Sequence, residues 1–579
     1  MFFFYFNRFK QLLMANQLFR KKSIEQIKKD YDAAEAHSGG HLKKVLGAWD
    51  LTFLGIAAVI GAGIFSTIGN AAYNGGPGVS ILFVITAIAC GFSALCYAEF
   101  ASRVPVSGSA YTYSYVTFGE IVAWIIGWAL ILEYAIGNIV VAISWSGYFN
   151  NLLVNLFHIH LPDWMVVDPM TAKNAYSEAT TALASGALAN GRTVEDYRFA
   201  VDAWNNAPVV AGYKVFFNLP AFIIVVLITW LAYIGIKESK KTANAMVLFK
   251  IGVIIFVIVA GAFFVDVNNW TPFLPNRFEG VLRGVSAVFY AYIGFDAIST
   301  TAEECKNPQR DMPKAMINSL LICTVLYILI ALTLTGIENY ANFKDVSDPL
   351  AFVFEKRAPW IETVVSVSAV IATTSVLLVF QLGQPRIWMS MSRDGLLPKK
   401  FQKIHPKYQT PSFATIVTGV LVAIPALFIE DVIVTDLTSI GTLFAFALVA
   451  GGVLLLPRIE KQPGRFSLPY INGRFIIPVV VALFIYVFRS RIKEGLLNFG
   501  NENHQEVLFL LFVLVAIVMA ILSFLKQFSF IPIMGVLFCL YLMVEIPANS
   551  WLVFFGWMLL GLIVYFLYGY RNSRLRSNS

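Results

Sequence analysis

Among the ionisable residues inside apolar stretches of this chain, three stand out: Glu133, Lys250 and Asp296. A charge at the depth of a membrane costs roughly 3 kcal/mol or more, so such residues usually serve binding or coupling. Lys250 lies about eight residues, or roughly 12 Å, into its stretch. A lysine at this depth is a candidate proton carrier. The alternative is a lysine whose long side chain reaches the lipid headgroups.

The two carboxylates allow several roles. Glu133 lies about thirteen residues into its stretch, which is near the middle of a membrane-spanning helix. It could meet a cationic substrate side chain or order the site through a water molecule, and the alternative is a structural carboxylate paired with a neighbouring helix. Asp296 is a candidate either for a helix cap or for a gating or binding group.

Glycines interrupt the first apolar stretch, which runs from Asp50 to Phe65 and contains Gly61 and Gly63. A pair of small residues can ease helix packing, but that motif spaces them four apart. We therefore expect a broken helix. Hydrocarbon offers no water to an interrupted backbone, so a break is tolerated only where it lines a cavity or holds a ligand.

A second interruption is expected between Val285 and Glu304. Gly294 supplies the flexible point, and Asp296 can begin a new half-helix. Two interrupted helices at matching places in two halves of a chain indicate the binding site of an inverted-repeat transporter.

Such breaks predict a site for a small zwitterion. Amides at the start of a half-helix attract a carboxylate, and carbonyls at the end of the preceding half accept from an ammonium group. An α-amino acid needs both. The expected carboxylate ligands are the amides around Ala62, Gly63 and Ile64. The expected acceptors for the amine are carbonyls at Val59 and Ile60 and near Phe289, Tyr290 and Tyr292.

The composition requires a membrane protein. Of 579 residues, 58% are hydrophobic and 13% are charged, and the mean hydropathy is +0.69. A span needs about 20 apolar residues. Fourteen candidate spans are expected near 51–76, 78–102, 120–153, 216–236, 243–265, 281–303, 315–337, 361–391, 412–430, 434–456, 475–489, 506–525, 528–545 and 549–569.

Basic residues predict the orientation. Nine lysines or arginines precede the first span, and the connection 392–411 after the eighth is also basic, which places both on the cytoplasmic side. The loop 155–212 has three basic and six acidic residues and is expected outside. The basic triplet Arg489, Arg491 and Lys493 conflicts with this pattern, because it falls on a predicted outer connection.

Other features limit the possible partners and cofactors. The net charge of +8 is an orientation signal rather than evidence for nucleic acid. Five cysteines lie within or beside spans, so we expect neither a disulfide framework nor a metal cluster. The pairs His37 and His41, and His158 and His160, are weak metal signals without acidic or cysteine partners. We expect translation to start at Met14 and residues 23–37 to form a surface helix.

Several motifs resemble the cationic amino acid transporter branch of the amino acid, polyamine and organocation superfamily. The resemblance covers Leu42 to Ser573 without most of the loop 155–212. The motifs that carry it are 61–65, 94–102, 105–115, 127–134, 293–304, 306–313, 392–398 and 565–573. The eighth span at 372–386 only loosely matches the serine and threonine pattern of the animal cationic members.

The resemblance implies an all-α LeuT-type fold, with a five-plus-five inverted repeat and four additional C-terminal spans. It implies a substrate site on Gly61 to Ile64 and on Phe289 to Ile293, with side-chain contacts from the eighth span. In proton-linked relatives a lysine at the place of Lys250 substitutes for a sodium ion. The implied regions are a cytoplasmic segment 1–48, a core 49–456, peripheral spans 457–570 and a cytoplasmic tail 571–579.

The sequence thus predicts a proton-coupled L-amino acid permease of the inner or plasma membrane, working as a monomer by alternating access without a cofactor. An exchanger without proton coupling is the main alternative. A membrane-embedded sensor usually needs an output module, and an ion channel fits two broken helices less well. An enzyme is disfavoured because the chain resembles no nucleophile triad, metal motif or phosphate loop.

Overall fold

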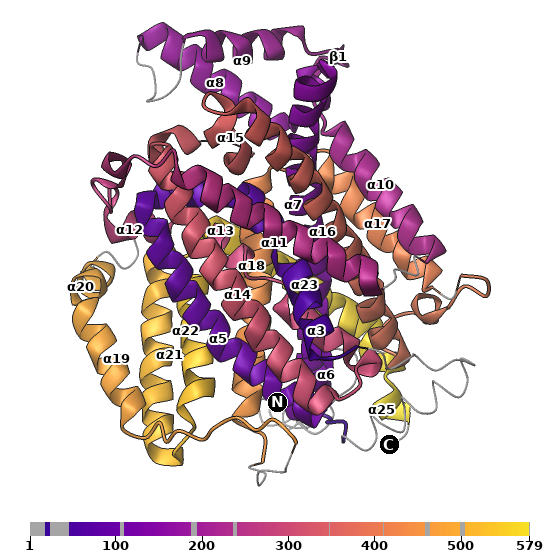
Figure 1. The fold of residues 1–579 in the computed structure, drawn as a ribbon. Coiled ribbons are helices and arrows are strands. Elements are labelled where there is room, and N and C mark those ends of the chain that lie inside the picture. The colour runs from indigo at the N-terminus through magenta and orange to yellow at the C-terminus, as the bar shows by residue number, and fades with distance from the viewer. Residues whose placement is uncertain are drawn as a thin grey trace, which may run out of the picture.

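The computed structural model describes residues 18–23, 46–104, 109–186, 194–235, 240–344, 346, 348–408, 410–457, 464–497 and 504–577. These residues are mostly helical (Figure 1). The expected start at Met14, residues 24–37 of the surface helix expected at 23–37, and the pair His37 and His41 lie outside the described residues.

The first half of the chain builds helices interrupted by one long insertion. The helices are α3 (Ala48–Val59), η1 (Gly63–Thr67), α4 (Ile68–Gly75), α5 (Val79–Arg103), α6 (Ser109–Thr117), α7 (Glu120–Phe157), α10 (Leu219–Ile234) and α11 (Lys240–Ala262). The insertion contains α8 (Pro169–Ser185), α9 (Val194–Asn206) and the antiparallel pair β1 (Val209–Val210) and β2 (Tyr213–Lys214). It projects from the end of the bundle opposite α25 (Arg574–Ser577) (Figure 1).

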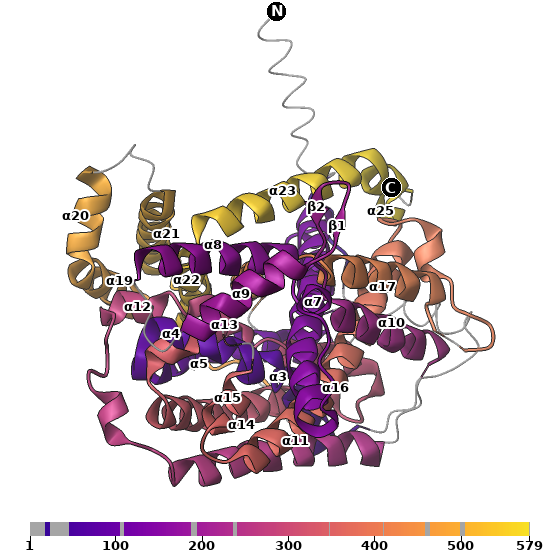
Figure 2. The same cartoon turned by 90° about the horizontal axis from the view of Figure 1, so that it is seen from above.

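The second half repeats the order of a broken span followed by long helices. Its elements are α12 (Arg277–Leu282), α13 (Val285–Tyr290), η5 (Phe295–Glu304), α14 (Pro308–Ile337), α15 (Pro349–Glu355), α16 (Pro359–Arg393), α17 (Ser412–Ala426) and α18 (Asp431–Val453). The remaining long helices are α19 (Ile476–Val487), α20 (Arg489–Leu497), α21 (His504–Lys526), α22 (Phe530–Val544) and α23 (Ala548–Val564). Three short helical segments follow: η8 (Tyr565–Gly569), α24 (Tyr570–Asn572) and α25 (Arg574–Ser577). Seen from above, α19, α20 and α21 lie at one edge of the molecule and α10 and α17 lie towards the opposite edge (Figure 2).

These helices confirm a polytopic helical membrane protein. Among the described residues, eight helices are long and apolar enough to cross a membrane, or up to nine if a pair bent by 45° counts as one span. That bent pair, Arg277–Arg283 and Val285–Ser299, coincides with the expected sixth span. Five shorter apolar helices coincide with the expected first, fourth, ninth, eleventh and thirteenth spans. The count of fourteen stays a prediction.

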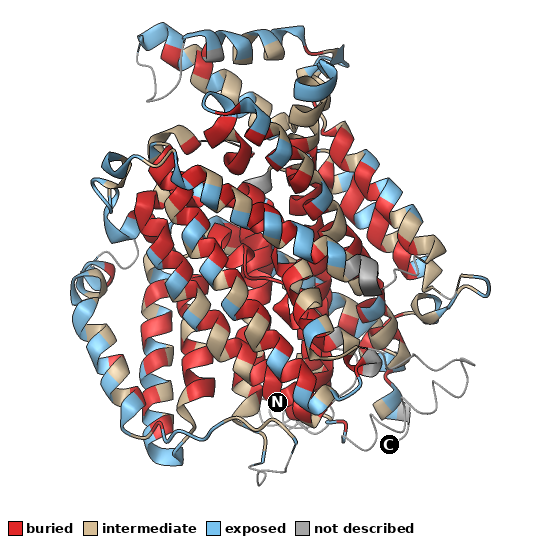
Figure 3. Ribbon diagram, in the orientation of Figure 1, coloured by how far each residue is buried: buried red, intermediate tan, exposed pale blue. Residues whose placement is uncertain are grey.

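Buried residues fill the centre of the bundle, and exposed residues lie mainly on its outside (Figure 3). Many of the exposed residues are large and apolar. On the edge helix α19, for example, Val479 is 67% exposed. A belt of exposed apolar residues around a packed centre is what a lipid environment allows, because hydrocarbon does not penalise apolar surface.

The two chain ends are fastened to one end of the bundle. Lys22 Nζ pairs with Asp394 Oδ1 at 2.7 Å, and Tyr111 donates its hydroxyl to Asp394 Oδ2 at 2.6 Å. The buried Glu120 at the start of α7 accepts from Ser573 Oγ at 2.5 Å. Both described terminal segments therefore lie on the same side of the helical bundle.

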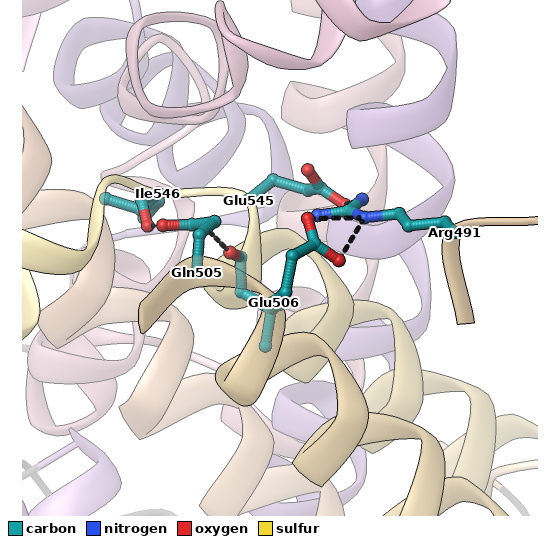
Figure 4. A network of polar contacts seen from close by, with 6 residues as sticks. Arg491, Gln505, Glu506, Glu545 and Ile546 are labelled. Atoms are coloured by element: carbon teal, nitrogen blue, oxygen red, sulfur yellow. Dashed lines mark hydrogen bonds and ion pairs between the residues drawn. The ribbon is translucent and has the colours of Figure 1, made fainter. Parts of the chain in front are cut away.

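Arg491, one of the basic residues that conflicted with the expected orientation, is held by two carboxylates. Its guanidinium pairs with Glu506 at 3.2 Å and with Glu545 at 2.7 Å, and Gln505 donates to Ile546 O at 3.1 Å beside this network (Figure 4). Arg491 of α20 thus links its helix to α21 and to the end of α22 through ion pairs. Because its charge is paired in this way, Arg491 is a poor indicator of membrane orientation.

The two interrupted spans pack backbone against backbone. A Cβ atom placed on Gly63 would lie 2.3 Å from Ala291 Cα, and one placed on Gly294 would lie 2.9 Å from the carbonyl carbon of Ala58. Gly294 also has φ of +119°, a conformation that favours glycine. Each break thus brings a glycine against the other broken span.

We expect Gly63→Ala to lower the thermal midpoint of the purified protein. The added methyl group would push span one away from Ala291, and such overpacking costs roughly 1–3 kcal/mol of unfolding free energy. Gly252→Ala is the matched control, because a Cβ atom on this α11 glycine meets nothing within 4 Å. Equal midpoints for the two variants would contradict the close approach.

Candidate substrate site

The break in the first span opens where sequence reasoning placed it. Helix α3 ends at Val59, Ile60 is extended with ψ of 97°, and η1 begins at Gly63. The amide of Ile64 donates to Gly61 O at 3.1 Å. A bound carboxylate would therefore share or replace this local hydrogen bond.

The break in the sixth span lies between Tyr290, where α13 ends, and Phe295, where η5 begins. The carboxylate of Asp296 faces the amides of Asp296 itself and Ala297, in the first turn of η5. Asp296 is 2% exposed, and its Oδ2 has no hydrogen-bond partner within the part of the chain that the structure describes. Both of the roles expected for Asp296 are compatible with this position.

A small cavity lies between the two breaks and two long helices. Its lining residues are apolar apart from one tyrosine. It is lined by Ala58, Val59, Gly61, Ala62 and Gly63 of the first span, Tyr290 and Ile293 of the sixth, Val141 of α7, and Val376 and Phe380 of α16.

Some of the expected residues do not line this cavity. Phe289 packs edge-on against Phe446 of α18, and Tyr292 donates its hydroxyl to Phe83 O of α5 at 3.0 Å. Ile60 and Ile64 are fully buried next to the lining residues. Tyr290 does line the cavity, and its hydroxyl donates to Gly137 O at 3.0 Å.

Four lining residues were not singled out from the sequence: Ala58, Val141, Val376 and Phe380. The only signal for Val376 and Phe380 was the resemblance, which implied that the eighth span contributes to the side-chain pocket. Nothing in the local pattern around Val141 separates it from the other apolar residues of α7.

Lys250 contacts the end of the first half-helix. It is 1% exposed, and its Nζ donates to Ala57 O at 3.2 Å and to Ile60 O at 3.3 Å. Tyr327 of α14 donates to the neighbouring Val59 O at 2.9 Å. The amine of Lys250 is thus buried among the helices and does not reach towards the lipid headgroups. The two carbonyls expected to hold the amine each accept one hydrogen bond within the protein: Val59 O from Tyr327, and Ile60 O from Lys250.

Glu133 lies behind the cavity wall rather than in it. It is 3% exposed, and its Oε2 has no hydrogen-bond partner among the described residues. Its charge interacts with that of Asp296, so the two carboxylates are near neighbours. Glu133 precedes Gly137, the acceptor of the Tyr290 hydroxyl, by about one turn of α7.

Neither a metal centre nor a disulfide is found in the described part of the chain. No group of three or more histidine, cysteine or acidic residues there is placed to hold a metal ion. All five cysteines are buried and free. His158 and His160 are exposed near the end of α7.

Comparison with known proteins gives the family. A sequence profile of amino acid permeases matches residues 46–521, and a profile of the C-terminus of these permeases matches residues 529–573. The chain is 38% identical to the branched-chain amino acid permease BcaP of Bacillus subtilis, over 97% of this chain and 100% of the relative. It is 36% identical to the methylthioribose transporter of the same organism, over 97% and 99%. It is 31% identical to the cationic amino acid transporter 3 of Arabidopsis thaliana, named as mitochondrial, over 95% of each chain.

These relatives are transporters rather than enzymes, and the chain belongs to the amino acid permease family of the amino acid, polyamine and organocation superfamily.

Proposed function

We propose that this permease imports a neutral, apolar L-amino acid by alternating access, with protons as the coupling ion and the substrate held between the broken first and sixth spans. The observation that carries the proposal is the pair of adjoining helix breaks, whose residues line a small cavity together with apolar residues of α7 and α16. In the proposed arrangement, spans one to five and six to ten are inverted repeats, and four further spans lie at the periphery.

The cavity wall supports a neutral substrate. The side chains of Val141, Val376 and Phe380 face the space from α7 and α16. An unpaired cationic head placed against them would lose its hydration without gaining a partner. The nearest carboxylates, Glu133 and Asp296, do not line the cavity. The name of the Bacillus permease, which specifies branched-chain amino acids, agrees with an apolar pocket.

Uptake by reconstituted protein tests the substrate class. We expect proteoliposomes with an inward proton gradient to accumulate labelled leucine or alanine, and excess unlabelled arginine or glutamate to compete poorly. Liposomes without protein give the background. Selective uptake of arginine or lysine would contradict the apolar-pocket proposal.

We propose Lys250 as the coupling residue. Its Nζ holds the end of α3 through Ala57 O and Ile60 O, so its protonation state changes the charge at the end of the half-helix that borders the cavity. Gain and loss of that charge can bias which side the site faces.

Lys250→Met should therefore abolish proton-driven accumulation more severely than it weakens equilibrium binding of substrate, because methionine keeps an apolar stem and removes both hydrogen bonds. Accumulation is measured in proteoliposomes and binding by thermal shift. Lys526→Met, on an exposed lysine in the last turn of α21, is the control. If Lys250→Met still concentrated substrate with the pH dependence of the unmodified protein, the proton would travel elsewhere, and Glu133 would be the next candidate.

Two other functions give different results in the same vesicles. An exchanger without proton coupling would show counterflow of labelled substrate and no response to the gradient. A sensor would bind its amino acid without moving it. The proposal needs net accumulation that depends on the gradient.

We propose that the protein lies in the inner or plasma membrane as a functional monomer, with α8 and α9 outside and both chain ends in the cytoplasm. A cysteine in place of the exposed Ser185, in a cysteine-free background, should react with a membrane-impermeant thiol reagent in intact cells. Reaction only after permeabilisation would reverse the proposed orientation.

A further inference from the structure

The short helix α15 rests on the second half of the broken first span. Pro349 Cβ lies 3.2 Å from a Cβ atom placed on Gly69 of α4. Tyr148 of α7 donates its hydroxyl to Phe65 O of η1 and lies against the backbone of Leu350. Helix α15 is at the same end of the bundle as α8 and α9 (Figure 1). Helix α15 thus covers η1 and α4, the second half of the first span.

Two amides on one face of α7 hold carboxyl groups from two other elements. Asn151 donates through Nδ2 to Asp348 Oδ2, directly before α15, and Asn155 donates through Nδ2 to Glu362 Oε1 at 2.6 Å, in the first turn of α16. Residues four apart on a helix point the same way, so the two contacts are neighbours. Asp348 is 9% exposed and Glu362 is 8% exposed.

Negative charge surrounds Asp348. Glu362 of α16 and Glu355 of α15 repel its carboxylate, and Tyr148 of α7 is within range of its charge. Among the described residues, the side chain that stabilises the ionised form is the Asn151 amide. Burial, with a smaller effect from Glu362, raises the pKa of Asp348 to about 7. Its carboxyl group therefore binds a proton in the pH range of living cells.

We propose that Asp348, Glu362 and the two α7 amides form a proton-sensitive catch, which fastens α15 over the first span when Asp348 is protonated and loosens it when Asp348 is ionised. A proton on Asp348 removes the repulsion from Glu362 and lets both carboxyl groups stay against α7. Ionisation puts two buried negative charges side by side, and moving α15 towards water relieves them.

The direction of the pH effect follows from linkage. In the fastened form the pKa of Asp348 is raised from 3.8 to about 7, and in a loosened, hydrated form it returns towards its ordinary value. The proton therefore stabilises the fastened form. This stabilisation is complete below the ordinary pKa and is lost as the pH rises through about 7. The catch goes beyond the proposed transport function, because it depends neither on the substrate nor on Lys250.

A distance measurement across the catch tests this inference without transport. In a cysteine-free background, spin labels on Asn70→Cys of α4 and Lys356→Cys after α15 occupy two exposed positions. We expect the distance between the labels in lipid nanodiscs to change between two populations with a midpoint near pH 7. Asp348→Asn, which is neutral at every pH, should remain in the low-pH population throughout.

Two matched variants test the direction in which the pH midpoint of the distance change moves. Glu362→Gln removes the stronger repulsion and should move the midpoint to lower pH by about one unit. Glu355→Gln removes a weaker repulsion and should move it less, in the same direction. These two variants keep the proposal testable if Asp348→Asn does not fold. The proposal is overturned by a distance that does not respond to pH in the unmodified protein, by a full transition in Asp348→Asn, or by an unchanged midpoint in Glu362→Gln.

Discussion

An interrupted helix within hydrocarbon must find hydrogen-bond partners inside the protein, and this constraint organises the structure. Water cannot satisfy the carbonyls at the end of α3, so side chains from other helices do: Lys250 donates to Ala57 O and Ile60 O, and Tyr327 donates to Val59 O. The glycines at both breaks let the broken spans touch along their backbones. These donors and contacts hold the two breaks side by side, and the small cavity lies between them.

The donor at this helix end is unusual in that its charge can change while its hydrogen bonds persist. A neutral lysine amine still carries two N–H groups, enough for the two carbonyls that Lys250 contacts. The ammonium form adds attraction to the partial negative charge at the end of a helix. Losing the proton would therefore weaken the hold on α3 without leaving a buried carbonyl unsatisfied. Tyr327 lacks this property because it donates as a neutral hydroxyl.

The breaks could be predicted from the sequence because glycine, aspartate and apolar length are local signals. Gly63 and Gly294 mark the interruptions correctly, and the depth of Lys250 follows from counting residues along its span. The rest depends on rotation and packing. A break disturbs the helical period, so the sequence around Phe289 and Tyr292 did not reveal that both side chains point away from the cavity. Phe380 reaches the cavity through the crossing of α7 and α16, which no local pattern encodes.

In the proposed transport cycle, the first span carries a proton-sensitive contact on each of its halves. Lys250 contacts the end of α3, and α15, beside Asp348, packs on η1 and α4 across the break. The interruption at Ile60 to Ala62 separates the two halves of the first span. In the proposed cycle, a proton at Lys250 therefore acts mainly on α3, and a proton at Asp348 acts mainly on η1 and α4. In this proposed cycle, a proton on Asp348 would close the half beneath α8 and α9, and a proton leaving Lys250 would free the other half. In this proposal the proton binds at Asp348 first and fastens one half of the first span. Loss of a proton at Lys250 then releases the other half. The order of these two events links the direction of the proton gradient to the direction of movement.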